Sequence, residues 1–193
     1  KRLFDNNNTL FYQNVNEPLK YGKHPEDELF QTDVLILDGK KNTFTPHFNY
    51  KGFQYVEVSS DKPLEQNKQD MTSHFIHTDL PQIGTFECSD SLINRLWRAT
   101  NYSYLSNLVG YPTDCPHREK NGWTGDAHLA IETALFNYDG ITLYEKWLAD
   151  HRDNMYENGR LHCIIPSGGW GGDIVDWTCS VTLIPWAIYE FYG

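Results

Sequence analysis

The stretch 86-FECSDSLINRLWRATNYSYLSNLV-109 marks the point where the pattern of the sequence changes. Ser89 or Asp90 is a suitable N-cap, because either side chain can accept a hydrogen bond from the first turn of a helix. After the cap, Leu92 and Leu96 are four residues apart, as on one face of a helix. The sequence therefore predicts that a helical region begins here.

Three further helices are expected after this one, over about 126–136, 140–156 and 175–191, with apolar residues at helical spacing. Pro185 is expected to kink or interrupt the last of them, because proline has no backbone N–H to donate. All six tryptophans lie in this half of the chain. Four helices can form a small bundle, but the apolar ending AIYEFYG (187–193) favours a larger helical domain.

Residues 1–86 have a pattern that is typical of β-structure. FQYVEVSS (53–60) alternates between two faces, TDVLILDG (32–39) is an apolar run with an Asp-Gly turn signal, and SHFIHTDL (73–80) is a further strand candidate. Short strands between polar loops predict a β-sandwich. The expected fold class is α+β, with a sandwich segment in 1–86 and a helical domain in 87–193.

Composition and charge limit the classes of function. The chain is 39% apolar and 15% aromatic, which suits a globular core. It carries 16 basic and 26 acidic residues, a formal net charge of −10, and no basic run. Nucleic acid is therefore not an expected partner. No apolar run is long enough to span a bilayer, and no signal peptide is recognisable at the N-terminus. The compartment stays open between the cytoplasm and the periplasm or exterior.

The chain has four cysteines, which are Cys88, Cys115, Cys163 and Cys179. They show neither CxxC spacing nor a dense framework, so buried free thiols are expected. Cys115, His117, His128 and Cys163 could be drawn as a zinc site, but their spacing matches no common zinc pattern. We expect no metal and no cofactor.

The loop 110-GYPTDCPHREKNGWTGDAH-128 concentrates ionisable groups in a segment too irregular for a helix or a strand. Its three carboxylates are Asp114, Glu119 and Asp126. Clustered carboxylates raise one another's pKa, so one can stay protonated near neutral pH and act as an acid. Arg118 can hold a neighbour ionised, and Trp123 offers a flat face for a sugar ring. This combination suits cleavage of a glycosidic bond, which usually needs two carboxyl groups.

The same residues also have an ordinary structural interpretation. Asp114 could form an Asx turn, and Asp126 could cap the second helix. Glu119 could form a solvated pair with Lys120, and Trp123 could belong to the core. Spacing alone leaves the catalytic and the structural interpretation open.

A resemblance to a known family favours the catalytic interpretation. DCPHREKNGWTGD (114–126) closely resembles the signature of the α-L-rhamnosidases of glycoside hydrolase family 78, from which it differs only at variable positions. HFNYKGFQYVEV (47–58) is similar to a strand pair of the family's β-sandwich, and LIPWAIYEFYG (183–193) resembles a later helix of its catalytic domain. The resemblance implies a β-sandwich segment followed by the first helices of an (α/α)6 toroid.

The family's residue roles are carried over by position. The resemblance implies that Glu119 is the general acid. It also implies five substrate-binding residues, which are Asp114, Arg118, Trp123, Asp126 and Trp177. The family's general base is a glutamate that would lie beyond residue 193. The chain alone is therefore expected to be inactive, with the remainder of the catalytic domain as its partner.

The expected function is release of terminal α-L-rhamnose from glycosides or polysaccharides, with inversion of configuration. Two alternatives stay open. One is another glycosidase on a similar toroid. Contacts to the C6 methyl group of rhamnose would distinguish a rhamnosidase from it. The other is a non-catalytic carbohydrate-binding fragment. The aglycone, the linkage and the oligomeric state are not indicated by the sequence.

Overall fold

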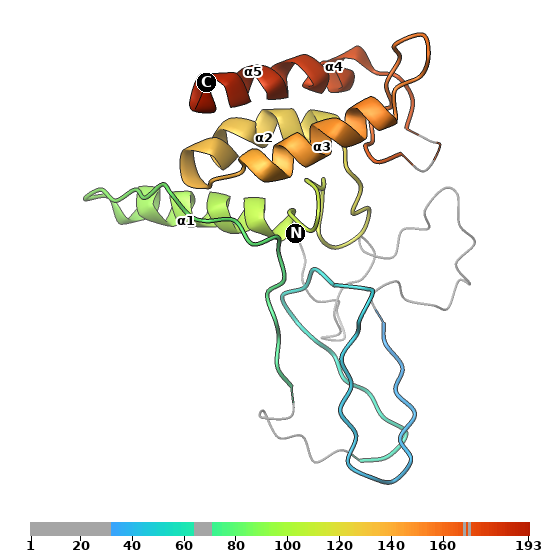
Figure 1. The fold of residues 1–193 in the computed structure, drawn as a ribbon. Helices are drawn as coiled ribbons and strands as arrows, with labels where there is room; N and C mark the ends of the chain where they lie inside the picture. The colour runs from blue at the N-terminus through green and yellow to red at the C-terminus, as the bar shows by residue number, and fades with distance from the viewer. Residues whose placement is uncertain (1–31, 64–70, 168, 170) are drawn as a thin grey trace, which may run out of the picture. The chain divides into compact units, whose positions relative to one another are not determined.

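The structure is a computed structural model that describes residues 32–63, 71–167, 169 and 171–193. It divides the chain into two units, Lys1–His74 and Phe75–Gly193. Figure 1 shows the chain coloured from the N-terminus to the C-terminus.

In the first unit, residues 32–63 and 71–74 are extended or bent chain without a strand ladder or a helix. Asp38 Oδ1 accepts hydrogen bonds from Lys40 N and Asn42 Nδ2, both at 3.0 Å, which closes the expected Asp-Gly turn. Apolar side chains such as Ile36 are exposed, because no layer of described residues covers them. The β-sandwich stays a prediction, and its residues 1–31 and 64–70 lie outside the described part of the chain.

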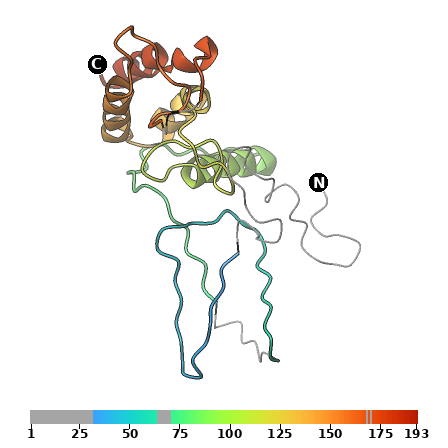
Figure 2. The same ribbon diagram turned by 90° about the vertical axis from the view of Figure 1, so that its right-hand side faces the viewer.

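The described part of the second unit contains five helices: α1 (Ser91–Ser106), α2 (Thr124–Asn137), α3 (Ile141–Asp153), α4 (Val175–Thr178) and α5 (Ser180–Tyr192). Helix α2 packs against α1, α4 and α5, and α3 packs against α5. Figure 1 and Figure 2 both show α2 between α1 and α5. The helical half predicted from the sequence is therefore present, with α2 at its centre.

The start of α1 is the one that the sequence predicted. Asp90 is the N-cap, and its Oδ1 accepts a hydrogen bond from Leu92 N at 2.8 Å. The start of α2 differs, because Trp123 is the N-cap and Asp126 lies in the first turn. A carboxylate there interacts favourably with the positive end of the helix dipole. The prediction that Asp126 could cap the helix is therefore wrong.

The last helix is interrupted at a different residue from the one predicted. The break falls at Cys179, between α4 and α5, whereas Pro185 lies inside α5. The Cys179 carbonyl accepts from Thr182 N at 2.9 Å and from Leu183 N at 3.0 Å, so the helix resumes at once. Pro185 is exposed, and its missing donor removes one hydrogen bond, to the carbonyl of Val181.

Residues 75–86 belong to the helical unit, whereas the sequence pattern predicts that the first domain ends at residue 86. Thr78 N donates to Leu108 O at 2.7 Å, beyond the end of α1. Ile83 N donates to Asn137 O at 2.9 Å, at the end of α2. These hydrogen bonds, together with the one from Gly84 N to Asn137 O, attach the extended segment to the helical unit, and the division falls before it.

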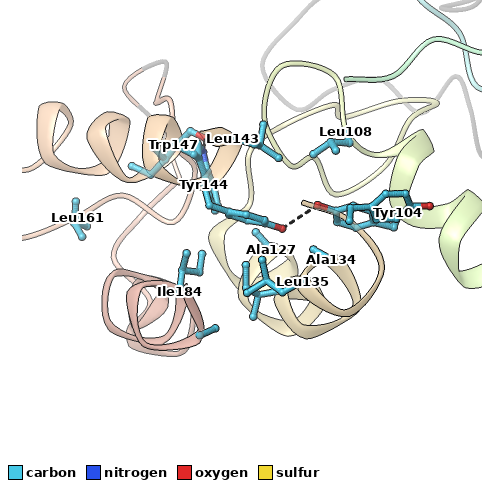
Figure 3. Close-up of a cluster of buried hydrophobic side chains, with 14 residues drawn as sticks. Tyr104, Leu108, Ala127, Ala134, Leu135, Leu143, Tyr144, Trp147, Leu161 and Ile184 are labelled. Carbon is cyan, nitrogen blue, oxygen red and sulfur yellow. Dashed lines mark hydrogen bonds between the residues drawn. The ribbon is translucent and has the colours of Figure 1, made fainter. Parts of the chain in front are cut away.

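The core of the helical unit lies between α2, α3 and α5 (Figure 3). Tyr144 and Trp147 of α3 and Ile184 of α5 are each 0% exposed. Figure 3 shows the Tyr144 hydroxyl directed at that of Tyr104 from α1, and the two oxygens are 3.1 Å apart. Burying a large apolar side chain stabilises the fold by roughly 1.5–3 kcal/mol. These contacts hold together the helices on which the loop 110–128 is mounted.

Large apolar side chains remain exposed on α1 and α5. Leu92 and Leu96 are 57% and 58% exposed, and Trp186 and Tyr189 are 57% and 63% exposed. This agrees with the expectation that these helices need further partners, since no described residue covers them. None of the described helices is both long enough and apolar enough to cross a membrane.

Candidate active site

The motif 114–126 forms an irregular loop that leads into α2. Asp114 N donates to Asn121 O at 3.1 Å, and Asn121 N donates to Asp114 Oδ1 at 3.0 Å, so the loop closes on itself. Lys120 has a φ of 55°, in the left-handed region. Such backbone strain in a residue other than glycine is concentrated at functional sites. The sequence between the two paired residues is therefore held as one tight turn.

Asp114 is fixed by two hydrogen bonds from its own loop. Its Oδ1 accepts from Asn121 N, and its Oδ2 accepts from the Cys115 thiol at 3.0 Å. Burial raises the pKa of the Asp114 carboxyl, the two hydrogen bonds oppose this shift, and the charge of Glu119 adds to it. Asp114 and Glu119 are therefore close enough to interact. The Asx turn considered for Asp114 is not formed, because residue 116 is a proline and has no N–H to donate; the hydrogen bonds from Asn121 and Cys115 orient the carboxyl group instead.

Glu119 is oriented by two neighbours. Trp123 Nε1 donates to Glu119 Oε2 at 3.0 Å, and Arg118 Nε lies 3.9 Å from Glu119 Oε1. The Glu119 side chain keeps 32% of its surface exposed. Its carboxyl group is thus held in one direction and is still accessible to a ligand. Trp123 is partly buried and contacts Glu119 through its indole nitrogen, so it is more than a core residue.

Asp114 and Asp126 line one cavity of about 460 Å³ between α1 and α2. Its walls include Leu96 and Tyr104 of α1 and Tyr144 of α3. This volume is within the range of small-molecule pockets, roughly 300–1,000 Å³. The cavity therefore combines two carboxylates with apolar and aromatic walls.

Arg118, Glu119 and Trp123 form a second cluster, and their side chains are not among those that line the cavity. Asp114 connects the two groups, since it lines the cavity and interacts with Glu119. The structure thus brings the five loop residues into two adjacent groups.

Trp177, from α4, packs against the start of α2. Thr124 Oγ1 lies 2.9 Å from Trp177 O and 3.0 Å from Cys163 O. A methyl group at Gly125 would lie 2.6 Å from the Trp177 indole nitrogen, so the ring rests on the glycine backbone. The indole Nε1 is buried without a partner among the described residues. Trp177 therefore touches the helix turn that carries Asp126.

Three small or neutral residues of the motif to which the sequence assigned no role also build the site: Cys115, Asn121 and Gly125. Cys115 and Asn121 bind Asp114, and Gly125 makes room for Trp177. A methyl group at Gly122 would lie 1.9 Å from Ile165 O. The signal that could have found them is their place between the ionisable residues of one motif.

No group of three or more His, Cys, Asp or Glu residues within the described ranges is arranged to hold a metal ion. All four cysteines are free thiols, which confirms that part of the prediction. Only Cys163 is buried, so the expected burial is wrong for the other three, which are partly exposed.

The comparison with protein families gives two matches. The model of the bacterial alpha-L-rhamnosidase 6 hairpin glycosidase domain matches residues 81–193, which include all five helices and the motif loop. The model of the bacterial alpha-L-rhamnosidase concanavalin-like domain matches residues 13–77. The helical unit thus falls in the class of six-hairpin glycosidases. More narrowly, the chain belongs to the family of bacterial alpha-L-rhamnosidase 6 hairpin glycosidase domains.

Two curated relatives carry the name alpha-L-rhamnosidase. One, from Formosa agariphila, is 35% identical over an alignment of 169 positions, which covers 81% of this chain. The other, from Streptomyces avermitilis, is 32% identical over an alignment of 165 positions, which covers 84% of this chain. The chain spans only 17% and 16% of the length of these two relatives.

Two solved structures are similar to the described fold. The alpha-L-rhamnosidase from Dictyoglumus thermophilum matches 58% of this chain and 13% of its own, with 43% identity and a TM-score of 0.56. The Streptomyces avermitilis enzyme in complex with L-rhamnose matches 59% of this chain and 11% of its own, with 31% identity and a TM-score of 0.58.

Proposed function

We propose that this chain supplies the acid side of the active site of an α-L-rhamnosidase of glycoside hydrolase family 78, which releases terminal α-L-rhamnose with inversion. The observation that carries the proposal is the oriented Glu119 carboxyl group, bound by Trp123 Nε1 at 3.0 Å beside the half-buried Asp114. The family match over residues 81–193 supports it. The β-sandwich for residues 1–86 is part of the same proposal.

Glu119 is the proposed general acid. Its carboxyl group gives a proton to the glycosidic oxygen while the bond from that oxygen to C1 of rhamnose breaks. Trp123 holds Oε2, and we assign the transferred proton to Oε1, which lies 3.9 Å from Arg118 Nε. The partial exposure of Glu119 supports this role, because the leaving group must reach it.

Asp114, Asp126 and Arg118 are the proposed polar contacts of the sugar. Each carboxylate oxygen has more than one acceptor position, so Asp114 can accept from sugar hydroxyls as well as from its loop. Arg118 is 42% exposed and can donate to a hydroxyl oxygen. Trp123 and Trp177 are the proposed aromatic walls, on which the apolar face of the sugar ring packs.

An inverting reaction also needs a base that activates water on the opposite face of the sugar, about 6.5–9.5 Å from the acid. We propose that this base is a glutamate outside residues 1–193, in the remainder of the catalytic domain. Isolated residues 1–193 should then bind rhamnose without hydrolysing rhamnosides.

The test is hydrolysis of methyl α-L-rhamnoside by the full-length protein, followed by ¹H NMR. Inversion predicts that β-L-rhamnose is the first product. A methyl α-L-mannoside, which adds one hydroxyl on C6, should be a much poorer substrate. Rhamnose binding without hydrolysis by the full-length protein would favour the carbohydrate-binding alternative. Equal rates on both sugars would favour a different glycosidase.

A further inference from the structure

Cys115 contacts the carboxyl group of Asp114 and the backbone of Glu119. Its thiol donates a hydrogen bond to Asp114 Oδ2 at 3.0 Å. The same sulfur accepts from Glu119 N at 3.3 Å, and it also binds the backbone of Lys120. One atom therefore contacts the carboxyl group of Asp114 and the backbone that carries Glu119.

The other three cysteines use their thiols differently. The thiols of Cys88, Cys163 and Cys179 donate to backbone carbonyl groups, at 3.5, 3.9 and 3.2 Å. Such contacts are what a cysteine makes when it only fills space in a fold. Cys115 is the one cysteine of the four whose thiol donates to a side-chain carboxylate.

We infer that Cys115 is a positioning residue, whose thiol fixes the Asp114 carboxyl group relative to the backbone of Glu119. This inference rests on the proposed function, in which Asp114 binds the sugar and Glu119 protonates the leaving group. Asp114 and Glu119 are five positions apart in an irregular loop. The hydrogen bonds of the Cys115 thiol therefore fix the group that binds the sugar relative to the group that protonates the leaving group.

The chemistry of the thiol suits this role. Burial raises the pKa of Cys115, and the hydrogen bond to Asp114 adds to the shift, so the thiol keeps its proton and stays a donor. Other charged groups near Asp114 are Glu119 of its own loop and Asp126 of α2, which lines the same cavity. Serine at position 115 keeps a donor and an acceptor, whereas alanine removes both.

The hydrogen bond can be tested without any enzyme activity. The rate of Cys115 alkylation by iodoacetamide is measured against pH, with each cysteine followed by peptide mass spectrometry, in the wild-type full-length protein and in Asp114→Asn. Loss of the carboxylate should lower the apparent pKa of the Cys115 thiol and leave its limiting rate at high pH unchanged. Cys88 and Cys179 serve as internal controls. An unchanged thiol pKa, or a fall accompanied by a higher limiting rate, would overturn the inference.

The positioning role is tested with Cys115→Ala, Cys115→Ser and the control Cys88→Ala in the full-length protein. Alanine at 115 should lower kcat/KM about tenfold or more, as small misplacements of reacting groups do. The loss of kcat/KM in Cys115→Ala should be larger on methyl than on p-nitrophenyl α-L-rhamnoside, because only the methyl rhamnoside needs the carboxyl groups of both Asp114 and Glu119. Serine should restore most of the activity.

The pH profile gives the readout that simple packing would not move. Asp114 loses a hydrogen-bond donor in Cys115→Ala, so its pKa should rise further and the acidic limb should move to higher pH. A wild-type rate and pH profile in Cys115→Ala would overturn the inference. If the wild-type protein does not hydrolyse rhamnosides, the proposed function fails, and the alkylation experiment alone decides on the Cys115–Asp114 bond.

Discussion

Gly125→Ala places a methyl group against the Trp177 ring, and two opposing effects decide its result. Alanine in place of glycine stabilises a helix interior by roughly 0.5–1 kcal/mol. The new Cβ atom, however, would lie 2.6 Å from the indole Cε2 and Nε1 atoms of Trp177, far inside van der Waals contact. Overpacking of this kind costs about 1–3 kcal/mol. We therefore expect net destabilisation of the start of α2.

The assay is hydrogen exchange of the peptide that contains Thr124 and Ala127, whose amides bond to Cys163 O and Trp123 O. Gly125→Ala should lower the local opening free energy of this turn by about 1 kcal/mol or more. Gly140→Ala is the matched control, because its Cβ atom would lie 3.4 Å from the nearest neighbour, the Tyr144 ring. This control should leave exchange at the start of α2 unchanged.

The double variant Gly125→Ala/Trp177→Leu separates the ring from the backbone effect. With the indole removed, alanine at 125 should become neutral or stabilising, a coupling of about 1–3 kcal/mol between the two positions. If Gly125→Ala stabilises the turn while Trp177 is present, Trp177 does not pack on this glycine. Its proposed place beside the site would then be wrong.

Three further predictions follow from single contacts. Asp114→Asn should reduce kcat/KM for p-nitrophenyl and methyl α-L-rhamnosides alike, because Asp114 binds the sugar and not the leaving group; a loss confined to the methyl rhamnoside would contradict this. Thr124→Val should lower the free energy of unfolding by about 0.5–1.5 kcal/mol, since the buried hydroxyl that bonds to Cys163 O and Trp177 O is lost while Thr124 N still donates to Cys163 O; calorimetry with the exposed Thr142→Val as control measures it. Burial lowers the pKa of His151 from its ordinary 6.5, so the unfolded chain binds the proton more readily. The contribution of neutral His151 to the free energy of unfolding should be complete above about pH 6.5 and should be lost as the pH falls below that value. Equal shifts of the melting temperature between pH 7 and pH 5 in the wild type and in His151→Gln would contradict this prediction.

The helical half of the fold was largely predictable because its signals are local. The cap at Asp90 and the apolar spacing of Leu92 and Leu96 act within one helix turn. The break at Cys179 was not predictable, since it depends on how α4 and α5 each pack on α2. The sequence predicted a kink or break at Pro185, but this residue lies on the exposed side of α5, where the helix tolerates it.

The candidate site was predictable only in part. Ionisable residues such as Asp114 and Glu119 are conspicuous in a sequence. The contact of Gly125 with Trp177 joins residues far apart in the chain, and the Cys115–Asp114 hydrogen bond depends on a turn with an unusual φ at Lys120. Neither follows from residue type or spacing, because both depend on the path of the folded backbone.

The most direct test of the central claim, that Glu119 is the general acid, is Glu119→Gln in the full-length protein, assayed on two leaving groups. The amide keeps the size of the side chain but has no proton to give. Turnover of methyl α-L-rhamnoside should fall about 10²-fold or more, whereas p-nitrophenyl α-L-rhamnoside should be affected far less, because its leaving group scarcely needs a proton. Glu132→Gln, at an exposed carboxylate of α2, is the matched control and should behave as wild type. Equal losses on both substrates in Glu119→Gln would contradict the account.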